Sequence, residues 1–258
     1  YWYNCSNEQL KVIFEEAHLW DGSLIGGKKT FRTTIKETAD FNSSTSFDVR
    51  LDHTVAIPGH PWKYDADFVY QKNWGRAIDI YGHFSSLKEN QHYKCACFEK
   101  VPPFMASSKN TDIIRYADVL LWKAEALIES GNIASGINII NQIRTRAKNS
   151  PYVKDFISPS QNAANYAIGM YSTALSQAEA IKALRMERRL ELANEGHAFY
   201  DLVRWGIAEQ YVNNYLQTEK NRRTYLTSAV LQSHELYLPI PQIEIDASAG
   251  VLKQRAGY

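Results

Sequence analysis

The chain has 258 residues, enough to bury a full hydrophobic core as one large domain or two small ones. Its 29 basic and 28 acidic residues leave a net charge of +1, so neither nucleic acid nor an anionic membrane surface is an expected partner. No apolar run approaches the ~20 residues that span a bilayer, and three cysteines are too few for a disulfide framework.

The first 47 residues give the weakest structural signals. Residues 6–20 fit either a helix with an N-terminal capping box or a short β-prone run. Residues 21–47 are rich in turn formers, threonine and serine, so we expect a loop there. Because the chain opens with Tyr1 and not with methionine, we interpret it as processed or cut.

The stretch from 58 to 84 combines turn formers with large aromatic residues, namely Pro58, Gly59, Pro61, Trp62, Tyr64, Tyr70, Trp74 and Tyr81. Such a segment is poor material for a regular core. Its rings either face a ligand from loops or pin those loops to the helices beneath, and the sequence leaves both interpretations open.

Residues 93–101 are predicted to form a strand that ends at Pro102-Pro103. His92, Cys95 and Cys97 could supply metal ligands, but their spacing is not that of the usual structural zinc sites. We therefore expect no metal ion here. Alternate residues of a strand share a face, so the two cysteines are expected to point the same way.

The helical part of the chain begins near Thr111 or Asp112, either of which could cap a helix that ends at Gly131. Its predicted apolar face consists of Ile114, Ala117, Leu121, Ala124 and Ile128. A second helix is predicted from 135 to 147, with Ile137, Ile140 and Ile143 on its apolar face. The 32 residues from 116 to 147 come close to the ~34-residue tetratricopeptide (TPR) period, which indicates a TPR-like helical pair.

The stretch from Ser176 to Trp205 predicts a second helical hairpin. Ser176 and Glu179 form a capping box, and Gly196 offers a left-handed stop. The second helix of this hairpin is indicated by Phe199, Leu202, Val203 and Ile207. Trp122 and Trp205 fall within helical patterns, so we expect both to be buried in helix packing. The connection 148–175 has no predicted role.

The helix that begins after Ser176 sets charged residues into a largely apolar surface between 181 and 193. Arg188 lies one turn from Glu191 and two turns from Glu195, while Glu187 and Glu191 share a face. Buried charges must be paired, so we predict a salt-bridge network in which Arg188 holds Glu191 and Glu195.

Five stretches resemble one known family, and two of them, NEQLKVIFEEAH from 7 to 18 and DVRLDHTVAIPGHPWKYD from 48 to 65, are similar to that family's E-x-IFE and D-x-RL-x-x-T segments. MERRLELANEGHAFYDLVRW, from 186 to 205, is similar to the ER-x-x-EL-x-x-EG-x-x-x-x-DL-x-RW signature of the SusD/RagB family. RYADVLLWKAEAL, from 115 to 127, resembles that family's RYA-D/E-VLL-x-x-AEAL helix. The closing ELYLPIPQIEIDASAGVLKQRAGY resembles its PIP-x-x-E-I and L-x-QN-x-GY motifs, but 246–250 and 255–256 replace the usual Asn-Pro pairs.

The resemblance implies a mainly α, SusD-like fold, in which TPR-like helical hairpins are capped by a long loop-rich region with short strands. We expect the loop-rich aromatic region at 1–110 and the helical region at 111–258. Together they are expected to form one structural unit that lacks the family's N-terminal part.

The same resemblance implies a function in polysaccharide utilisation. The family's members are outward-facing lipoproteins of the outer membrane that capture glycans for a TonB-dependent (SusC-like) transporter. For this chain it implies a glycan ligand, no cofactor, no enzyme activity, and membrane association only through a lipid anchor upstream of Tyr1.

A glycan site should combine exposed aromatic rings, which pack on the apolar faces of sugars, with polar groups that satisfy the hydroxyls. The loop tryptophans and their neighbours meet this requirement, with Trp20 as the weakest of the three tryptophans. The predicted ligand residues are Trp20, Trp62, Lys63, Tyr64, Asp65, Asn73, Trp74, Arg76 and Tyr81.

Two other functions compete with glycan binding. The helical pairs alone suggest a TPR-like module that binds proteins, although such a module should lack the aromatic loop region. A glycoside hydrolase would need two carboxylates about 5 to 9 Å apart, which Glu187 and Glu191 could provide. Because arginines surround those two residues, we interpret them as ion-paired and expect no hydrolysis.

Overall fold

The computed structural model describes residues 48–75, 84–88, 90–101, 104–110, 112–221 and 224–258. The chain divides into two compact units, Tyr1–Glu195 and Gly196–Tyr258. The described residues are mostly helical and contain a few short strands, which confirms the expected mainly α fold. The expected division into regions 1–110 and 111–258 stays a prediction.

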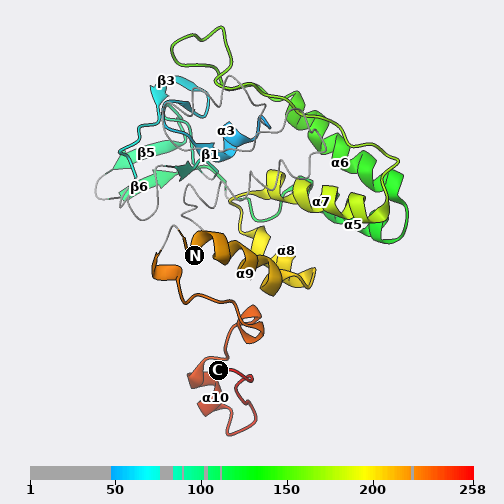
Figure 1. Ribbon diagram of the computed structural model, residues 1–258. Coiled ribbons are helices and arrows are strands. Elements are labelled where there is room, and N and C mark those ends of the chain that lie inside the picture. Colours follow the sequence, from blue (N-terminus) through cyan, green and yellow to red (C-terminus); the bar gives the residue numbers. More distant parts are fainter. Residues whose placement is uncertain (1–47, 76–83, 89, 102–103, 111, 222–223) are drawn as a thin grey trace. The chain divides into compact units, whose positions relative to one another are not determined.

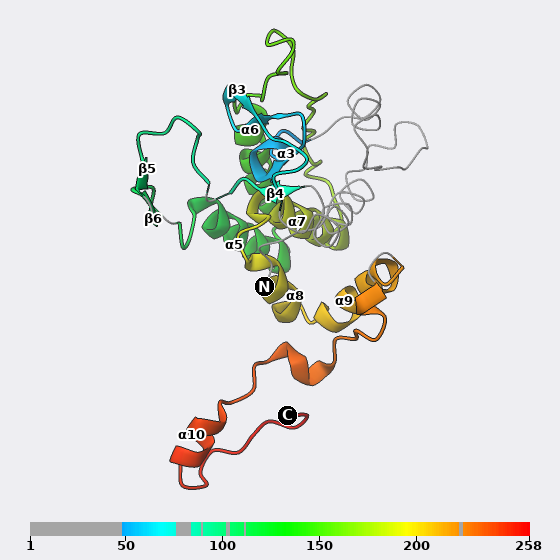
Figure 2. The same ribbon diagram turned by 90° about the vertical axis from the view of Figure 1, so that its left-hand side faces the viewer.

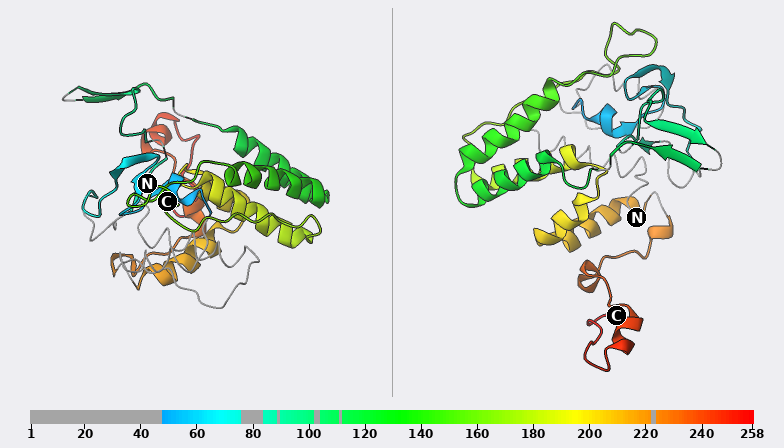
Figure 3. Two further views of the ribbon diagram at one scale, coloured as in Figure 1. Left: turned by 90° about the horizontal axis from the view of Figure 1, so that it is seen from above. Right: turned by 180° about the vertical axis from the view of Figure 1, so that it is seen from behind.

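Three helices form the centre of the first unit: α5 (Tyr116–Glu129), α6 (Ile133–Lys148) and α7 (Gln177–Leu192). Each packs on the other two, as Figure 1 and the right-hand view of Figure 3 show. The predicted faces of the first two helices supply much of their common core, which contains Leu121, Ala124, Ile128, Ile137, Ile140, Ile143, Ala180, Ala183, Leu184 and Leu192. Burial of each leucine or isoleucine contributes about 1.5–3 kcal/mol.

Helices α5 and α6 approach each other closely because Gly136 lies at their contact. A Cβ atom on Gly136 would lie 2.5 Å from Cγ1 of Ile128 and 2.9 Å from the carbonyl oxygen of Ala124. The turn between the helices contains Gly131 at φ 84°, which confirms the predicted stop. The TPR-like helical pair thus has the small residues that close packing requires.

The start of α5 differs from the prediction. The helix begins at Tyr116, after an extended Arg115, and not at Thr111 or Asp112, and Ile114 is exposed. The guanidinium of Arg115 binds Glu191 of α7 and Glu195, which follows that helix, and these tertiary contacts fix the chain ahead of α5. The burial expected for Trp122 is also wrong, since 43% of this residue is exposed.

The start of α7 follows the sequence closely, since Ser176 accepts from the backbone N–H of Glu179 in the predicted capping box. The helix ends at Leu192, before the predicted stop, and Gly196 has the expected left-handed conformation, φ 84°, at the N-cap of the next helix. In the second unit, α8 (His197–Arg204) stops before Ile207 because Gly206 adopts φ 69°. Trp205 is partly buried, with the guanidinium of Arg204 5.0 Å from the centroid of its ring.

The strands of the first unit form three small antiparallel pairs. α3 (Leu51–Thr54) leads into β1 (Val55–Ala56), which pairs with β4 (Ser85–Ser86). β2 (Pro61–Trp62) pairs with β3 (Asp65–Val69), and β5 (Phe98–Val101) pairs with β6 (Phe104–Ser107). Figure 2 shows α3, β3 and β4 near one another.

Two predictions for this region need correction. The aromatic stretch after Pro58, expected to form loops, includes a short hairpin in which Trp62 and Asp65 pair across a two-residue turn and the register shifts between Pro61 and Trp62. The strand expected from 93 begins only at Phe98, because turns occupy the preceding residues.

The connection 148–175, which had no predicted role, packs along the first unit. Asn141 on α6 holds its Tyr171 through two backbone hydrogen bonds, of 2.9 Å each. Gly169 accepts from Nε of Arg144 at 2.6 Å, and Ile168 is buried. Ala164 of the connection lies in a small core with Leu51, Val55 and Ile57, so the connection links the helices to the strand region.

The second unit continues through α9 (Ala208–Glu219), the 3-10 turns Thr224–Leu226 and Ser233–Leu236, and α10 (Gln242–Ala247). The amide of Gln254 bonds to both the backbone N–H and the carbonyl of Ile240, which closes the C-terminal segment. None of the helices in the described ranges has the length and apolarity needed to cross a membrane.

Candidate functional site

The charged residues of α7 form the predicted ion-pair network, but with different partners. The buried Glu187 accepts from Arg50 at 2.6 Å and from Arg144 at 3.0 Å. Arg188 pairs with Asp118 of α5 at 2.7 Å, so the expected pairing with Glu191 and Glu195 is wrong. Asp118, in the first turn of α5, takes the place of those two carboxylates as the partner of Arg188.

Glu191 and Glu195 instead share Arg115, whose guanidinium binds both carboxylates at 2.8–2.9 Å. Lys88 donates to the carbonyl of Glu191 at 2.7 Å and pairs with Glu195. Burial raises the pKa of Glu191, but the charges of Arg50 and the other arginines lower it by more. The pKa of this carboxyl group therefore lies below its usual value. Every carboxylate in this ion-pair network is engaged by a cation.

The β2–β3 hairpin brings four predicted ligand residues to one turn. Trp62 and Asp65 close the turn, and Lys63 and Tyr64 form its tip. Lys63 has φ 56°, a left-handed conformation that tight hairpin turns require. The turn therefore places an aromatic ring, a cation and a carboxylate within a few residues of one another.

Five aromatic rings gather on this hairpin and beside it. We call Trp62, Phe68, Tyr70, Trp74 and Tyr93 the aromatic cluster. Trp74 lies 5.0 Å from Phe68, 5.5 Å from Tyr70 and 6.4 Å from Trp62, between ring centroids. Tyr93 stacks on Phe68 at 3.9 Å with an interplanar angle of 10°.

A second, smaller stack lies at the hairpin tip. Tyr64 stands 5.3 Å from His92 in a stacked arrangement and 5.0 Å from His53. Nδ1 of His92 is 3.4 Å from Oδ2 of Asp65. Because His92 precedes Tyr93, one segment of chain supplies a ring to each stack.

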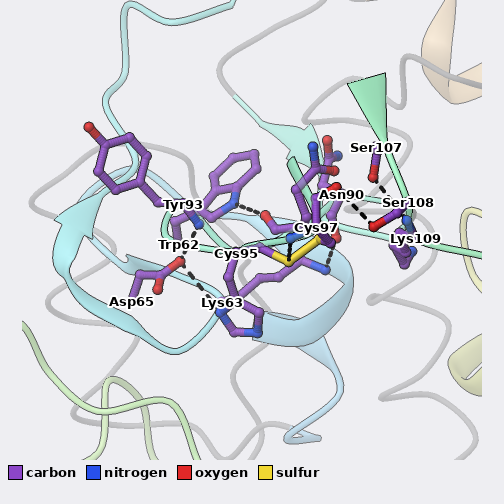
Figure 4. The surroundings of a disulfide bond; sticks show 12 residues. Trp62, Lys63, Asp65, Asn90, Tyr93, Cys95, Cys97, Ser107, Ser108 and Lys109 are labelled. Carbon is purple, nitrogen blue, oxygen red and sulfur yellow. Dashed lines mark hydrogen bonds and ion pairs between the residues drawn. A yellow bond between two sulfur atoms is a disulfide. The ribbon is translucent and has the colours of Figure 1, made fainter. Parts of the chain in front are cut away.

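That segment, residues 90–97, is the strap of the site. Its backbone carbonyls accept from the hairpin: Asn90 from Nζ of Lys63, and Gln91 from Nε1 of Trp62 at 3.0 Å. In return, Oδ2 of Asp65 accepts from the backbone N–H of Tyr93 at 2.6 Å. Figure 4 shows these residues around a disulfide between Cys95 and Cys97.

The disulfide changes the interpretation of the two cysteines. They lie in turns and are bonded to each other, with Cα atoms 5.1 Å apart, so the expected arrangement on one face of a strand is wrong. Within the described ranges, no group of three or more His, Cys, Asp and Glu side chains is arranged to hold a metal ion.

His60 fastens the hairpin to the rest of the unit. Its carbonyl accepts from the backbone of Tyr70 at 3.0 Å, and its Nδ1 lies 2.7 Å from Oδ1 of the buried Asp52 on α3. Tyr166 of the connection donates to the same carboxylate. Burial raises the pKa of Asp52, but the charge of His60 and these hydrogen bonds lower it below its usual value.

The cluster contains both buried and exposed rings. Tyr70 is 3% exposed, and Trp62 packs against a small core with its indole N–H bonded, so these two rings are mainly structural. By contrast, Trp74 is 44% exposed, Tyr93 48% and Tyr64 50%. Asp67 and Lys94 form an exposed ion pair nearby. The exposed rings and charges have the composition of a sugar-binding surface.

The structure thus brings together five of the nine predicted ligand residues: Trp62, Lys63, Tyr64, Asp65 and Trp74. Asn73 is exposed beside Trp74, whereas Trp20, Arg76 and Tyr81 lie outside the described residues. The sequence did not point to Phe68, His92 or Tyr93 as members of the site. Phe68 could have been found from the β-strand pattern after Asp65, but nothing local connects Tyr93 to it.

Comparison with known proteins agrees with this architecture. The model of the SusD family matches residues 4–258. SusD-like protein P25 of Formosa agariphila is 26% identical over 189 residues, 72% of this chain and 32% of the relative. SusD-like protein P38 of the same organism is 39% identical over 95 residues, 37% of this chain and 17% of the relative.

Two solved structures have similar folds. A SusD superfamily protein from Bacteroides vulgatus superposes with a TM-score of 0.52 and 26% identity, over 86% of this chain and 43% of its own length. A SusD homolog from Bacteroides thetaiotaomicron, 22% identical, gives a TM-score of 0.57 over 82% of this chain and 41% of its own, and supports the fold. The chain spans less than half the length of these relatives. Since the family model covers nearly all of it, the chain belongs to the SusD family.

Proposed function

We propose that the chain is part of a glycan-binding subunit, with the exposed rings of the hairpin and strap as its sugar platform. The observation that carries the proposal is the grouping of Tyr64, Trp74 and Tyr93, each about half exposed, beside Lys63 and Asp65. Aromatic faces stack on sugar C–H faces, and flanking charges bind hydroxyls. Membership of the SusD family supports a carbohydrate as the ligand.

The remainder of the proposal rests on the family. The whole protein is an outward-facing lipoprotein of the outer membrane, held by an upstream lipid anchor. It captures oligosaccharides or polysaccharides and passes them to a TonB-dependent, SusC-like transporter. Co-purification of the full-length protein with such a transporter from detergent-solubilised membranes is the expected result, and its absence would contradict this part.

We propose binding without hydrolysis. The Glu187–Glu191 pair considered for a hydrolase is buried and bound by arginines, whereas general acid–base chemistry needs carboxylates that reach the substrate. The check is incubation with α- and β-linked oligosaccharides, followed by chromatography of the products. Product formation that disappears in Glu187→Gln or Glu191→Gln would contradict the proposal.

Native gel electrophoresis through a panel of soluble polysaccharides tests the platform. We use amylopectin, laminarin, xylan, mannan and pectin, and expect at least one to retard the 258-residue chain. Trp74→Ala should weaken that binding at least about tenfold, or ~1.4 kcal/mol, with little change in melting temperature. Trp122→Ala is the matched control, because Trp122 is 43% exposed but belongs to α5. Equal loss of polysaccharide binding in the two variants would show that the site does not lie on the hairpin.

One observation favours the alternative of a protein-binding TPR-like module. Tyr116, Val119 and Trp122 recur every three residues along α5, and all are exposed. Such an apolar stripe is typical of surfaces that bind another protein. If this were the main function, Trp122→Ala would reduce binding to a partner protein, and no polysaccharide would retard the unmodified chain.

A further inference from the structure

Tyr93 is the exposed ring of the aromatic cluster that comes from outside the hairpin. Its ring lies 3.9 Å from that of Phe68 and nearly parallel to it, so Phe68 supports one face. Even so, 48% of the residue remains exposed. A ring with one supported face and an exposed remainder is well placed to stack on a sugar.

Contacts with the β2–β3 hairpin hold the strap on both sides of Tyr93. The backbone N–H of Tyr93 donates to Asp65 of β3, Gln91 accepts from Trp62 of β2, and Lys94 pairs with Asp67 of β3. Two residues after Tyr93, the Cys95–Cys97 disulfide closes the chain into a small ring. The backbone N–H of Cys95 donates to the carbonyl of His92 at 3.1 Å, which forms the turn that contains Tyr93.

The disulfide also fixes the far end of the strap. The backbone N–H of Cys97 donates to Sγ of Cys95 at 3.2 Å, within the same small ring. The carbonyl of Cys97 accepts from the backbone of Ser108 at 2.8 Å, just beyond the β5–β6 hairpin. The strap is therefore held at Tyr93 by Asp65, and after the turn by the disulfide.

We infer that the Cys95–Cys97 disulfide is a positioning element of the glycan site, which holds Tyr93 on Phe68 as a ligand-stacking ring. The inference rests on the proposed function and deepens it, since it makes glycan affinity depend on the oxidised state of this cysteine pair. When the disulfide opens, the turn loses its constraint and the ring no longer stays on its support.

The first measurement does not need a ligand. Backbone amide hydrogen exchange is followed for Tyr93 in the unmodified chain and in the Cys95→Ser/Cys97→Ser double variant. We expect exchange at Tyr93 to rise at least about tenfold in the variant, while the amides of α7 stay protected. Cys5→Ser is the matched cysteine control and should leave Tyr93 unchanged. Equal exchange in the variant and the unmodified chain would overturn the inference.

The second measurement uses the polysaccharide that retards the chain most strongly in the panel. Tyr93→Ala should weaken polysaccharide binding about tenfold, whereas Tyr93→Phe, which keeps the ring, should retain most of the affinity. Tyr116→Ala, which removes an exposed tyrosine of α5, should have no effect. Reduction by dithiothreitol is expected to act like Tyr93→Ala. In that step the reagent passes two electrons and two protons to the cysteine sulfurs, the S–S bond breaks, and the reagent becomes a cyclic disulfide.

A double-variant comparison separates positioning from a general structural role. If the disulfide acts through Tyr93, Cys95→Ser/Cys97→Ser should weaken binding no further in the Tyr93→Ala background. Independent, additive losses would overturn the inference. If no polysaccharide in the panel binds the unmodified chain, the proposed function fails, and the exchange measurement still decides whether the disulfide positions Tyr93.

Discussion

Two regions of the first unit use their large and charged residues in opposite ways. In the helical region, Glu187 and Arg188 are buried and bound by ionic partners from other segments. In the hairpin and strap, Trp74 and Tyr93 remain about half exposed although other rings lie next to them. The comparison indicates that the ion-pair network maintains the fold, while the exposed rings are available to a ligand.

The largest expected effect tests the helical side of this comparison. Arg188→Ala leaves Asp118 without its ionic partner in a buried site, which should lower the free energy of unfolding by about 3–5 kcal/mol. Urea denaturation measures this. Lys182→Ala, at an exposed position of the same helix, is the control and should change stability by less than about 0.5 kcal/mol.

A second variant identifies the partner of Arg188. In an Arg188→Met/Asp118→Leu pair, no buried charge is left alone, so much of the lost stability should return. If Arg188→Ala proved as mild as Lys182→Ala, the network would be a solvated surface and the contrast between the two regions would disappear.

Trp62 tests whether one ring of the aromatic cluster both maintains the fold and contacts the ligand. Because Trp62 packs on a small core and donates to Gln91, Trp62→Ala should lower stability by about 2 kcal/mol as well as weaken glycan binding. Trp74→Ala should weaken binding alone. Thermal melting and affinity electrophoresis of both variants measure this, and equal melting temperatures would show that Trp62 is no more structural than Trp74.

Gly136 tests how closely the helices must approach. The added methyl of Gly136→Ala would meet Ile128 and the backbone of Ala124, which should cost about 1–2 kcal/mol despite alanine's better helix propensity. At Gly169 an added Cβ meets nothing within 4 Å, so Gly169→Ala should leave stability nearly unchanged. Urea denaturation compares the two variants, and a more stable Gly136→Ala chain would contradict the close packing of α5 and α6.

The smallest expected effect concerns pH and the buried Asp52–His60 pair. Burial lowers the pKa of His60, but the neighbouring Asp52 raises it above its usual value, and the pKa of Asp52 lies below its own. The pair therefore stabilises the fold most between about pH 4 and pH 6.5. Its contribution is lost as pH rises through the folded pKa of His60, or falls through that of Asp52.

His60→Gln serves to isolate that contribution. Above pH 6.5 the unmodified chain should lose about 1 kcal/mol that the variant does not lose, as measured by urea denaturation at several pH values. Parallel pH profiles for the two chains would show that His60 is not charged in the folded state.

Much of the helical region could be predicted because its signals are local. The capping box of Ser176 and Glu179, the left-handed Gly131 and Gly196, and the isoleucine face of α6 all follow from short-range spacing and backbone sterics. The grouping of Trp62, Lys63, Tyr64 and Asp65 was also predictable, because four consecutive residues remain neighbours in any fold.

Only the tertiary structure decided which distant residues meet. Arg188 pairs with Asp118, 70 positions away, and Arg115, just ahead of α5, binds Glu191 of α7. No periodic pattern in the sequence marks either partner. In the site, Tyr93 reaches Phe68 through a strap closed by Cys95 and Cys97, a bond that spacing alone did not indicate. Sequence specifies local conformation through propensity and capping, whereas these contacts depend on the burial and charge that arise when separate segments pack together.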